Sequence, residues 1–381
     1  MRVLVLGGAG FIGETAVEDL VRTSDFSEIV IGDIDVQKAQ KLVSRLNDPR
    51  LTMKVVDVTK ETQLLESVRG FDVVTNALPF KYDLAVTKAC IEAGVNGIDV
   101  SATREQLELD SEAKSAGVKF VLGCGATPGI TNILARRGAD MLDKVSEIQI
   151  AWAAFRCTAP APGLLHTTLW EFDPRTEDRV YYADGQFIKV PPFSGERVVE
   201  FAKPIGTQNV YYVPHPETIT LPRFLPSLRK VEVRGTWPSE TMRFLRFMNT
   251  FGFYRKEPVE VKGQSVVPYD WMHDYMMKCP EAKETSIWAY GLIVEVIGSS
   301  KRKKIKHSFR TSHPRMDKWG GKSAYARNVG YPLSIGTQML AKGQVNATGV
   351  IAPEAAFNPS EFIRELSKRE IKVSHRTEKA V

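Results

Sequence analysis

A glycine-rich turn near the start of the chain constrains the fold more than any other feature. Residues 2–6 read RVLVL, an apolar run typical of a buried parallel strand, and lead directly into GGAGFIG at 7–13. Helical periodicity follows over 14–22. In the G-x-G-x-x-G spacing, the missing side chains permit a tight turn, close approach of a pyrophosphate and tight packing of helix on strand. This turn is therefore predicted to bind a dinucleotide at the helix N-terminus, through Gly8, Gly10, Phe11, Ile12 and Gly13.

An acidic residue follows at the spacing that this interpretation requires. A second strand is expected over 28–32 and ends at Asp33, twenty residues after Gly13. A carboxylate at this point accepts hydrogen bonds from ribose hydroxyls and would repel a 2′-phosphate. Asp33 and the neighbouring Ile34, helped by Asp35, therefore favour NAD over NADP. The alternative is that Asp33 caps the next helix, although Asp35 fits that cap better.

Strands and helices continue to alternate, which is the pattern of a doubly wound α/β domain with a parallel sheet. Further strands are expected over 54–56, 71–76, 96–100 and 119–122, and helices over 36–46, 83–93 and 105–116. Ligands of such sheets bind at the carboxyl ends of the strands. The residues predicted to line the cofactor at these ends are Asp57, Val58, Ala77, Leu78, Pro79, Asp99, Ser101, Gly125 and Pro128.

The turn after the last of these strands resembles a known family. It reads GCGATPGITN over 123–132, a G-x-x-P-G segment leading into a helix, and an A-L-P turn precedes it at 77–79. Both features resemble the saccharopine dehydrogenase superfamily. Residues 126–134 and the Asp-Val-Ser at 99–101 are most similar to its L-lysine 6-dehydrogenase and saccharopine reductase-like branch. The resemblance spans essentially the whole chain, is densest over 1–135, and implies an NAD(P)-dependent oxidoreductase acting on a C–N bond.

The length of the chain and the resemblance together predict two domains. At 381 residues the chain is too long for one ordinary core. We expect a Rossmann domain over 1–125 and an α+β substrate and dimerisation domain over 126–330, which includes a hairpin of strands at 288–298 and 305–311. The C-terminal segment 331–373, with a helix from Tyr331, is expected to return to the Rossmann domain. Residues 374–381 are predicted to be a frayed tail.

Removal of a hydride from a C–N bond also requires a base and groups that hold the charged ends of the substrate. The resemblance implies an amino acid or an amine-linked conjugate as substrate. The catalytic candidates are Asp99 and His166, and the candidates for a substrate carboxylate are Arg156, Arg223 and Arg234. Each has a structural alternative: Asp99 as a strand end satisfied by backbone N–H groups, His166 as a surface or supporting residue, and the arginines as surface ion pairs.

One departure from the family weakens the lysine assignment. The family has an arginine-aromatic-proline-glycine-histidine run that corresponds to a segment within 231–253. Arg234 stands in this segment, but the histidine is absent. No role carried by that histidine is therefore transferred to this chain.

Composition argues against several other classes of protein. The net charge is +6, but no aromatic-interleaved basic stripe accompanies it, so an anionic cofactor is favoured and no nucleic-acid partner is predicted. No apolar run reaches the roughly 18 residues of a membrane helix, so no membrane contact and a cytoplasmic location are predicted. The cysteines are too scattered for disulfides or a metal site, and none is predicted; they are Cys90, Cys124, Cys157 and Cys279.

The sequence therefore predicts an NAD-dependent amino-acid dehydrogenase or imine reductase of the saccharopine or lysine dehydrogenase type, expected to form a homodimer. Two alternatives stay open. One is reductive condensation of an amino acid with an aldehyde, as in saccharopine reductase or carboxynorspermidine synthase. The other is a non-catalytic sensor that binds the dinucleotide and reports its occupancy to a partner. Turnover with an amine or imine would separate the enzymes from the sensor.

Overall fold

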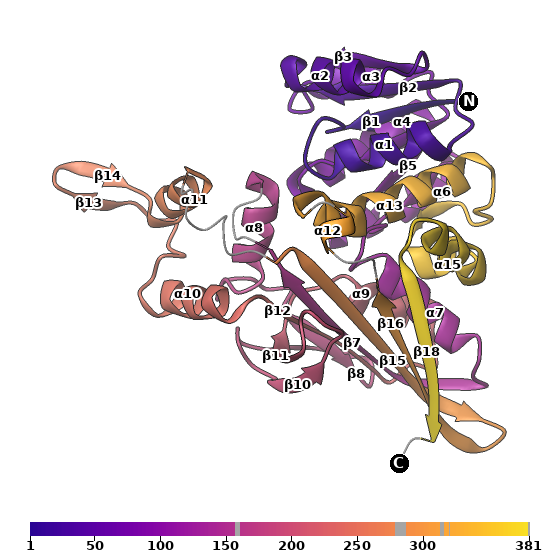
Figure 1. Ribbon diagram of the computed structural model, residues 1–381, viewed down its shortest axis with the longest axis vertical. Helices are drawn as coiled ribbons and strands as arrows, with labels where there is room; N and C mark the ends of the chain where they lie inside the picture. The colour runs from indigo at the N-terminus through magenta and orange to yellow at the C-terminus, as the bar shows by residue number, and fades with distance from the viewer. Residues whose placement is uncertain (157–160, 279–286, 313–315, 320, 380–381) are drawn as a thin grey trace. The chain divides into compact units, whose positions relative to one another are not determined.

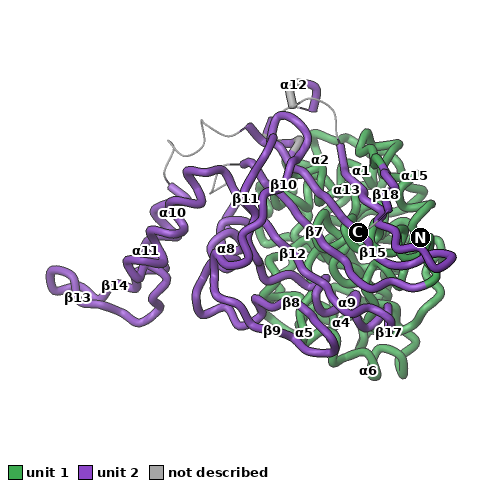
Figure 2. Tube along the Cα trace, turned by 90° about the horizontal axis from the view of Figure 1, so that it is seen from below, with its two compact units in different colours: residues 1–143, 326–374 green, residues 144–325, 375–381 purple. Residues whose placement is uncertain are grey.

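Two compact units make up the chain. The computed structural model describes residues 1–156, 161–278, 287–312, 316–319 and 321–379 (Figure 1). Unit 1 contains residues 1–143 and 326–374, and unit 2 contains residues 144–325 and 375–381 (Figure 2). Each unit is thus assembled from segments far apart in the sequence. Unit 1 extends beyond the expected boundary at 125 because α7 (Ile130–Ala139) packs against α14 (Pro353–Ala356) and α15 (Pro359–Lys368).

Unit 1 is built on a seven-stranded sheet in which every neighbouring pair of strands is parallel. The strand order is β17-β6-β5-β4-β1-β2-β3. Apart from the added β17, this is the doubly wound order 3-2-1-4-5-6, in which the direction of winding reverses beside β1. The strands are β1 (Arg2–Leu6), β2 (Glu28–Asp33), β3 (Leu51–Val55), β4 (Val73–Asn76), β5 (Asn96–Asp99), β6 (Lys119–Val121) and β17 (Gly349–Ile351).

Helices cover both faces of this sheet, and the first strand shows why. Leu4 and Leu6 pack into one hydrophobic core, whereas Val3 and Val5 pack into another. A strand buried on both faces has a continuous apolar sequence, as RVLVL predicted. The first core includes residues of α3 (Glu61–Val68), α4 (Asp83–Ala93) and α6 (Asp110–Ser115), and the second includes residues of α1 (Gly13–Thr23), α2 (Val36–Leu46) and α13 (Lys322–Ala341).

The C-terminal segment returns to the Rossmann sheet, which confirms the expected fold. β17 pairs with β6, and Arg369, the residue directly after α15, forms a buried ion pair with Asp19 of α1. The Nε of Arg369 lies 2.7 Å from the carboxylate of Asp19, and their side chains are 4% and 0% exposed. This pair connects the two ends of unit 1, and each partner has a further ion pair, Asp19 with Arg22 and Arg369 with Glu365.

Unit 2 contains a nine-stranded mixed sheet with the main order β10-β11-β12-β7-β15-β16-β18, and β8 and β9 join it beside β12. β7 runs parallel to β12 and antiparallel to β15. The long central strands are β7 (Lys144–Phe155), β12 (Lys230–Thr236), β15 (Ala289–Ser300) and β16 (Lys303–Ser312). The shorter strands are β8 (Val180–Ala183), β9 (Gln186–Lys189), β10 (Arg197–Glu200), β11 (Thr207–Tyr212) and β18 (Lys372–Lys379).

The remaining elements of unit 2 are mainly helical. They are α8 (Pro162–Trp170), α9 (Glu217–Phe224), α10 (Ser239–Thr250), α11 (Pro268–Lys278), α12 (Met316–Trp319) and the separate hairpin of β13 (Val259–Val261) and β14 (Gln264–Val266). α11 packs against α8, and its aromatic residues Trp271 and Tyr275 remain 52% and 57% exposed.

Three expected elements differ in the structure. The helix expected over 105–116 is two short helices, α5 (Arg104–Glu108) and α6, which meet at Leu109. The helix expected from Tyr331 begins at Lys322, as α13. The frayed tail predicted from Ser374 is wrong, because residues up to Lys379 belong to β18, an edge strand beside β16. Its polar sequence hides the strand because an edge strand buries few side chains.

Candidate functional site

The turns after β1 and β4 lie against each other at the carboxyl end of the sheet in unit 1. The N–H of Ala77 donates to the carbonyl of Leu6 at 2.9 Å. A Cβ placed on Gly7, whose φ is +67°, would lie 3.0 Å from the Cδ2 of Leu78. This is the point at which the strand order reverses, where open α/β sheets bind their ligands. Of the residues predicted there, Ala77 and Leu78 are half-buried and Pro79 is exposed.

The glycine turn has the close backbone packing that a phosphate cradle requires. A Cβ on Gly13 would lie 2.1 Å from the carbonyl oxygen of Gly7, and one on Gly8 would lie 2.9 Å from that of Val5. Gly10 is exposed, and a Cβ there would meet only the Gly7 oxygen, at 3.1 Å. The N-terminus of α1 therefore carries an open, side-chain-free surface, which fits the pyrophosphate of a dinucleotide. Phe11 is half-buried and Ile12 buried beside it.

Asp33 lies at the end of β2, next to this turn. Its carboxylate accepts hydrogen bonds from the N–H groups of Ala9 and Asp35, both at 3.0 Å. Asp35 caps α2 by accepting from the N–H of Lys38 at 3.0 Å, so Asp33 is not the N-cap. Ile34 is 66% exposed beside it. Asp33 is thus fixed to the glycine turn with the remaining lone pairs of its carboxylate available to a ribose.

After β3, Asp57 folds its side chain back onto its own turn. Its Oδ1 accepts from the N–H of Thr59 at 3.1 Å and from its hydroxyl at 2.6 Å. Asp57 and the neighbouring Val58 are half-buried, and Val58 packs against the first core. Both residues lie at the carboxyl edge of the sheet, as predicted from the sequence.

Two carboxyl groups are buried near the carboxyl edge of the sheet, those of Asp99, the last residue of β5, and Asp83, the first residue of α4. Asp99 is fully buried; its Oδ1 accepts from the N–H of Gly123 at 2.7 Å and its Oδ2 from the amide of Gln106 at 2.6 Å. Asp83 is equally buried and accepts from the amide of Asn76 at 2.8 Å. Burial raises the pKa of both carboxyls, that of Asp83 to about 7, and the charge of Asp83 raises the pKa of Asp99 further. Asp99 is held in the manner of a structural strand end.

The loop after β6 closes on itself. The N–H of Gly125 donates to the carbonyl of Pro128 at 2.9 Å, and both residues are buried. Ser101, in the loop after β5, is half-buried. The loops after β4, β5 and β6 are adjacent because the three strands are neighbours in the sheet.

The three candidate arginines of unit 2 lie in different environments. Arg156 is 2% exposed, lies 4.3 Å over the ring of Trp237 and donates to the hydroxyl of Thr168 at 2.9 Å. Arg223 is exposed at the end of α9. Arg234, which is 8% exposed, pairs with Glu232 and donates to a backbone carbonyl at 2.7 Å. Arg234 therefore fits the structural alternative of an ion pair, although a buried one.

His166 forms a pair with a tyrosine from a neighbouring helix. Its Nδ1 lies 2.8 Å from the hydroxyl of Tyr269, and the two rings meet edge to face at 6.1 Å. Burial raises the pKa of Tyr269 to about 12, so its hydroxyl keeps its proton at neutral pH, and the tautomer of the imidazole decides which of the two groups donates. This bond fixes the orientation of a half-buried histidine in unit 2.

Sequence analysis missed a buried acid–base cluster in unit 2. Glu171 accepts from the indole N–H of Trp237 at 2.8 Å, and the Nδ1 of His215 lies 3.2 Å from the carboxylate of Glu217. Burial raises the pKa of Glu171 to about 7. Burial acts to lower the pKa of His215, but Glu217 and then Glu171 outweigh it and raise that pKa. The available signals were Glu171 directly after Trp170 and His215 between two prolines.

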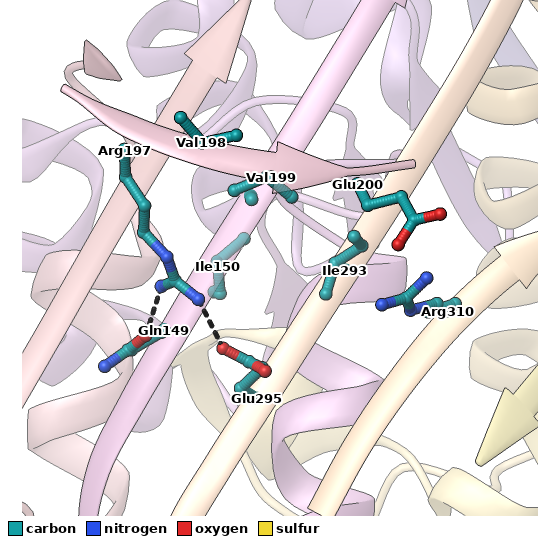
Figure 3. Close-up of a pocket in the computed structure, with 10 residues that line it drawn as sticks. Gln149, Ile150, Arg197, Val198, Val199, Glu200, Ile293, Glu295 and Arg310 are labelled. Carbon is teal, nitrogen blue, oxygen red and sulfur yellow. Dashed lines mark hydrogen bonds and ion pairs between the residues drawn. The ribbon is translucent and has the colours of Figure 1, made fainter. Parts of the chain in front are cut away.

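A separate cavity of about 120 Å³ lies on the sheet of unit 2 (Figure 3). Arg197 reaches across from β10 to hydrogen-bond with Gln149 and to pair with Glu295 at 2.7 Å. None of the lining residues is one of the residues predicted for substrate or cofactor.

Two family models together match almost the whole chain. The saccharopine dehydrogenase NADP binding domain matches residues 3–121, and the saccharopine dehydrogenase C-terminal domain matches residues 125–371. The chain belongs to the saccharopine dehydrogenase family. The resemblance found in the sequence is thereby confirmed, and this member of the family is an oxidoreductase acting on CH–NH donors.

Individual relatives agree with this assignment. The carboxyaminopropylagmatine dehydrogenase of Synechocystis is 23% identical, with 97% of this chain and 96% of the relative covered. The carboxynorspermidine synthase of Vibrio cholerae is 24% identical over 68% of this chain and 69% of its own length. Saccharopine dehydrogenase (L-Glu forming) from Saccharomyces cerevisiae matches in structure with a TM-score of 0.73 over 99% of both chains, at 16% identity, which shows the shared fold.

Other expectations concern membranes and cysteines. Among the helices that the structure describes, none is long and apolar enough to cross a membrane. In the described ranges, no group of three or more histidine, cysteine, aspartate or glutamate side chains could hold a metal ion. Cys90 and Cys124 are buried free thiols, and Cys157 and Cys279 lie outside the described residues.

Proposed function

We propose that this protein is an NAD-dependent enzyme of the reductive condensation type. In that reaction an aldehyde and an amine lose water to form an imine, and the imine accepts a hydride and a proton to become a secondary amine. The observation that carries the proposal is the match over nearly the full length of the chain to a relative named for a carboxyaminopropyl amine. A second relative is named for a carboxylated norspermidine. The substrate class is therefore a carboxylated amine conjugate, and the absent histidine argues against L-lysine itself.

The cofactor preference rests on Asp33. The family model is named for NADP, which carries a 2′-phosphate, but this chain has carboxylates at both Asp33 and Asp35. A lysine follows at position 38, but it is engaged in an ion pair with Asp35 at 2.9 Å. Because a 2′-phosphate would lie against the Asp33 carboxylate, we propose that NAD(H) binds more tightly than NADP(H).

The residues of the chain have distinct roles in this proposal. The turn of Gly8, Gly10 and Gly13 holds the pyrophosphate, and Asp33 holds the adenosine ribose. When bound, the nicotinamide supplies or accepts the hydride. In unit 2, His166 holds the transferable proton, oriented by Tyr269, and Arg223, the exposed one of the three candidate arginines, binds the substrate carboxylate. Asp99, first considered as a base, has no exposed surface and serves instead as a positioning group.

Fluorescence titration of the purified chain with NADH and NADPH tests the cofactor proposal. We expect micromolar affinity for NADH and an affinity for NADPH at least about tenfold lower, equivalent to about 1.4 kcal/mol. Asp33→Ser should narrow that ratio, whereas Asp72→Ser, an exposed aspartate, should leave it unchanged. An Asp33→Ser variant with an unchanged ratio would contradict the role of Asp33.

Turnover then tests the reaction. The oxidised cofactor is incubated at alkaline pH with a carboxyaminopropyl amine, with saccharopine and with L-lysine, and NADH is followed by absorbance. We expect turnover of the carboxyaminopropyl amine. If L-lysine were the only substrate turned over, the proposed reaction would be oxidative deamination and not reductive condensation. Tight NADH binding without turnover of any amine would favour the dinucleotide sensor, and absence of binding would overturn the proposal as a whole.

A further inference from the structure

Two consecutive hydrogen bonds connect the loop after β6 to the C-terminal segment of the chain. The N–H of Gly129 donates to the Oδ1 of Asn132 at 2.9 Å, and the Nδ2 of Asn132 donates to the Oε2 of Glu354 at 2.8 Å. Asn132 and Glu354 are 1% and 0% exposed. Glu354 lies in α14, 222 residues after Asn132, so only the tertiary fold of unit 1 brings it to this loop.

The side chain of Glu354 decides which way the amide of Asn132 points. An amide has an accepting oxygen and a donating nitrogen, and one orientation serves both neighbours here. In the flipped orientation, the amide oxygen would face the carboxyl oxygen of Glu354, and the amide nitrogen would face the N–H of Gly129. Asn132 therefore supplies the acceptor that holds Gly129, and Glu354 keeps that acceptor in place.

Gly129 is packed directly against the start of the same turn. Its φ is +129°, and a Cβ there would lie 2.0 Å from the carbonyl oxygen of Gly125. The N–H of Gly125 donates to the carbonyl of Pro128 at 2.9 Å, and the N–H of Ile130 donates to the carbonyl of Gly125 at 2.9 Å. Because the backbones at 125 and 129 are in contact, a displacement of Gly129 moves the whole turn of residues 125–129.

This turn lies at the carboxyl edge of the sheet, where we propose that the dinucleotide binds. The N–H of Cys124, just before the turn, donates to the carbonyl of Asp99 at 2.7 Å. A Cβ on Gly125 would lie 3.3 Å from the carbonyl oxygen of Val100, in the loop after β5. The turn is therefore in contact with the neighbouring loop of the proposed cofactor site, and its shape contributes to the shape of that site.

α14 is fastened to α7 by a further bond that does not involve the side chain of Glu354. The Nη1 of Arg136, on α7, donates to the backbone carbonyl of Glu354 at 2.8 Å. A substitution of Glu354 leaves this bond in place. The contribution of the Glu354 side chain to the turn can therefore be changed while α14 stays attached to α7.

We propose that Glu354 is a positioning residue for the cofactor: through Asn132 it holds the turn of residues 125–129 in the shape that receives the nicotinamide end of the dinucleotide. The inference rests on the proposed function, since it requires a dinucleotide at this edge of the sheet. The pyrophosphate and the adenosine ribose bind elsewhere, at the glycine turn after β1 and at Asp33. Loss of the two hydrogen bonds therefore weakens the binding of the nicotinamide end and leaves the binding of the rest of the cofactor unchanged.

Calorimetric titration of the full chain with NADH and with ADP-ribose tests this inference, because ADP-ribose lacks the nicotinamide ring. Asn132→Asp replaces the donating amide by a second carboxyl group that faces Glu354. We expect its affinity for NADH to fall about tenfold and its affinity for ADP-ribose to change less than about twofold. Glu354→Gln, added to Asn132→Asp, restores one donor and one acceptor with their roles exchanged. The double variant should recover NADH affinity to within about threefold of the wild type.

Asp110→Ala is the matched control. The Oδ1 of Asp110 accepts from the N–H of Val350 at 3.0 Å, so it also joins the C-terminal segment to the first part of the chain. It lies beside Gly349, the first residue of β17, and thus at the amino edge of the sheet, away from the proposed cofactor site. Asp110→Ala should lower stability in urea and keep the wild-type affinities for NADH and ADP-ribose.

A role in stability alone would weaken both ligands equally, so the difference between NADH and ADP-ribose is the decisive readout. Equal losses for the two ligands in Asn132→Asp, an unchanged NADH affinity, or a double variant no better than Asn132→Asp would overturn the inference. A wild type that binds neither ligand would instead exclude the proposed function, and this inference with it. If Asn132→Asp fails to fold, Glu354→Ala replaces it, since the bond from Arg136 is kept; a selective loss of NADH affinity supports the inference, and its absence overturns it.

Discussion

At the scale of single residues, two glycines of one turn meet different demands. Gly13 faces backbone, and a Cβ there would lie 2.1 Å from the Gly7 carbonyl oxygen. Gly10 faces outward, and its Cβ would meet one atom, at 3.1 Å. Gly13 is required by the packing of α1 on β1, and Gly10 by the dinucleotide that we propose for this surface.

Alanine substitutions should separate these two roles. Gly13→Ala forces the turn and α1 apart, so we expect the free energy of unfolding to fall by about 1–3 kcal/mol, together with NADH affinity. Gly10→Ala should change stability by less than about 1 kcal/mol and yet lower NADH affinity about tenfold or more. Urea unfolding and fluorescence titration of both variants provide the test. Equal losses of stability in the two variants would contradict the distinction.

Glu171 makes stability depend on pH. Burial raises its pKa from 4.5 to about 7 in the folded chain, so between these values the folded state binds more protons than the unfolded state. Its contribution to stability is therefore full below about pH 4.5 and is lost as the pH rises to about 7. Glu171→Gln should remove about 2–3 kcal/mol of the decline between pH 5 and pH 8.

Urea unfolding at the two pH values measures this decline. Glu177→Gln is the matched control, because that side chain is 83% exposed. The control should keep the wild-type decline in full. If Glu171→Gln also kept it, Glu171 would not be the group responsible.

At the scale of elements, the last strand shows how little of an edge strand is visible in a sequence. β18 reads KVSHRTEK, with few apolar residues. It is held by its neighbour: the ring of His375 stacks on Phe309 at 4.5 Å, and Lys306 pairs with Glu378 at 3.1 Å. β16 in turn gains a partner along an edge that would otherwise be open to other chains.

Removal of residues 375–381 should therefore destabilise unit 2. We expect the free energy of unfolding to fall by about 1–3 kcal/mol and aggregation on heating to increase, because the edge of β16 becomes exposed. Calorimetry and light scattering of the truncated chain measure both effects. Removal of residues 380–381 alone is the control and should change neither. If removal of residues 375–381 left stability unchanged, the prediction of a frayed tail would be supported instead.

At the scale of the whole molecule, each unit combines distant segments, and exposed apolar side chains are concentrated in unit 2. Those that are large and exposed there are Phe187, Val198, Phe247, Phe251, Val261, Trp271, Tyr275 and Ile287. Two pairs of these rings are in contact, Phe247 with Phe251 and Trp271 with Tyr275. The homodimer expected from the sequence remains a prediction, and these two exposed pairs are where we expect its interface.

Light scattering of the purified chain during gel filtration measures its mass. A homodimer would have twice the 42.5 kDa of one chain. The double variant Trp271→Ser and Phe251→Ser should weaken dimerisation if the helices of unit 2 contribute to the interface. A wild-type mass of 42.5 kDa would contradict the expected homodimer.

The sequence by itself was sufficient to predict the doubly wound fold of the first 125 residues. The glycine turn and Asp33 meet within about thirty residues of chain, and the continuous apolar run at 2–6 is itself the pattern of a strand buried on both faces, so local sequence reveals them. The G-x-x-P-G segment at 125–129 indicated the saccharopine dehydrogenase family. The structure confirms the doubly wound sheet that the local features predicted.

The tertiary structure alone decided features that depend on distant partners. The sequence made Asp99 a candidate base at a strand end, but its side chain is fully buried and its two carboxylate oxygens accept hydrogen bonds from Gln106 and Gly123. Glu171 and His215 are unremarkable in the sequence, because only folding buries them beside Trp237 and Glu217. β18 exists because β16 offers an open edge. Sequence periodicity records what each residue does within its own element, whereas burial and the pKa values that follow from it are set by segments that meet only in the folded chain.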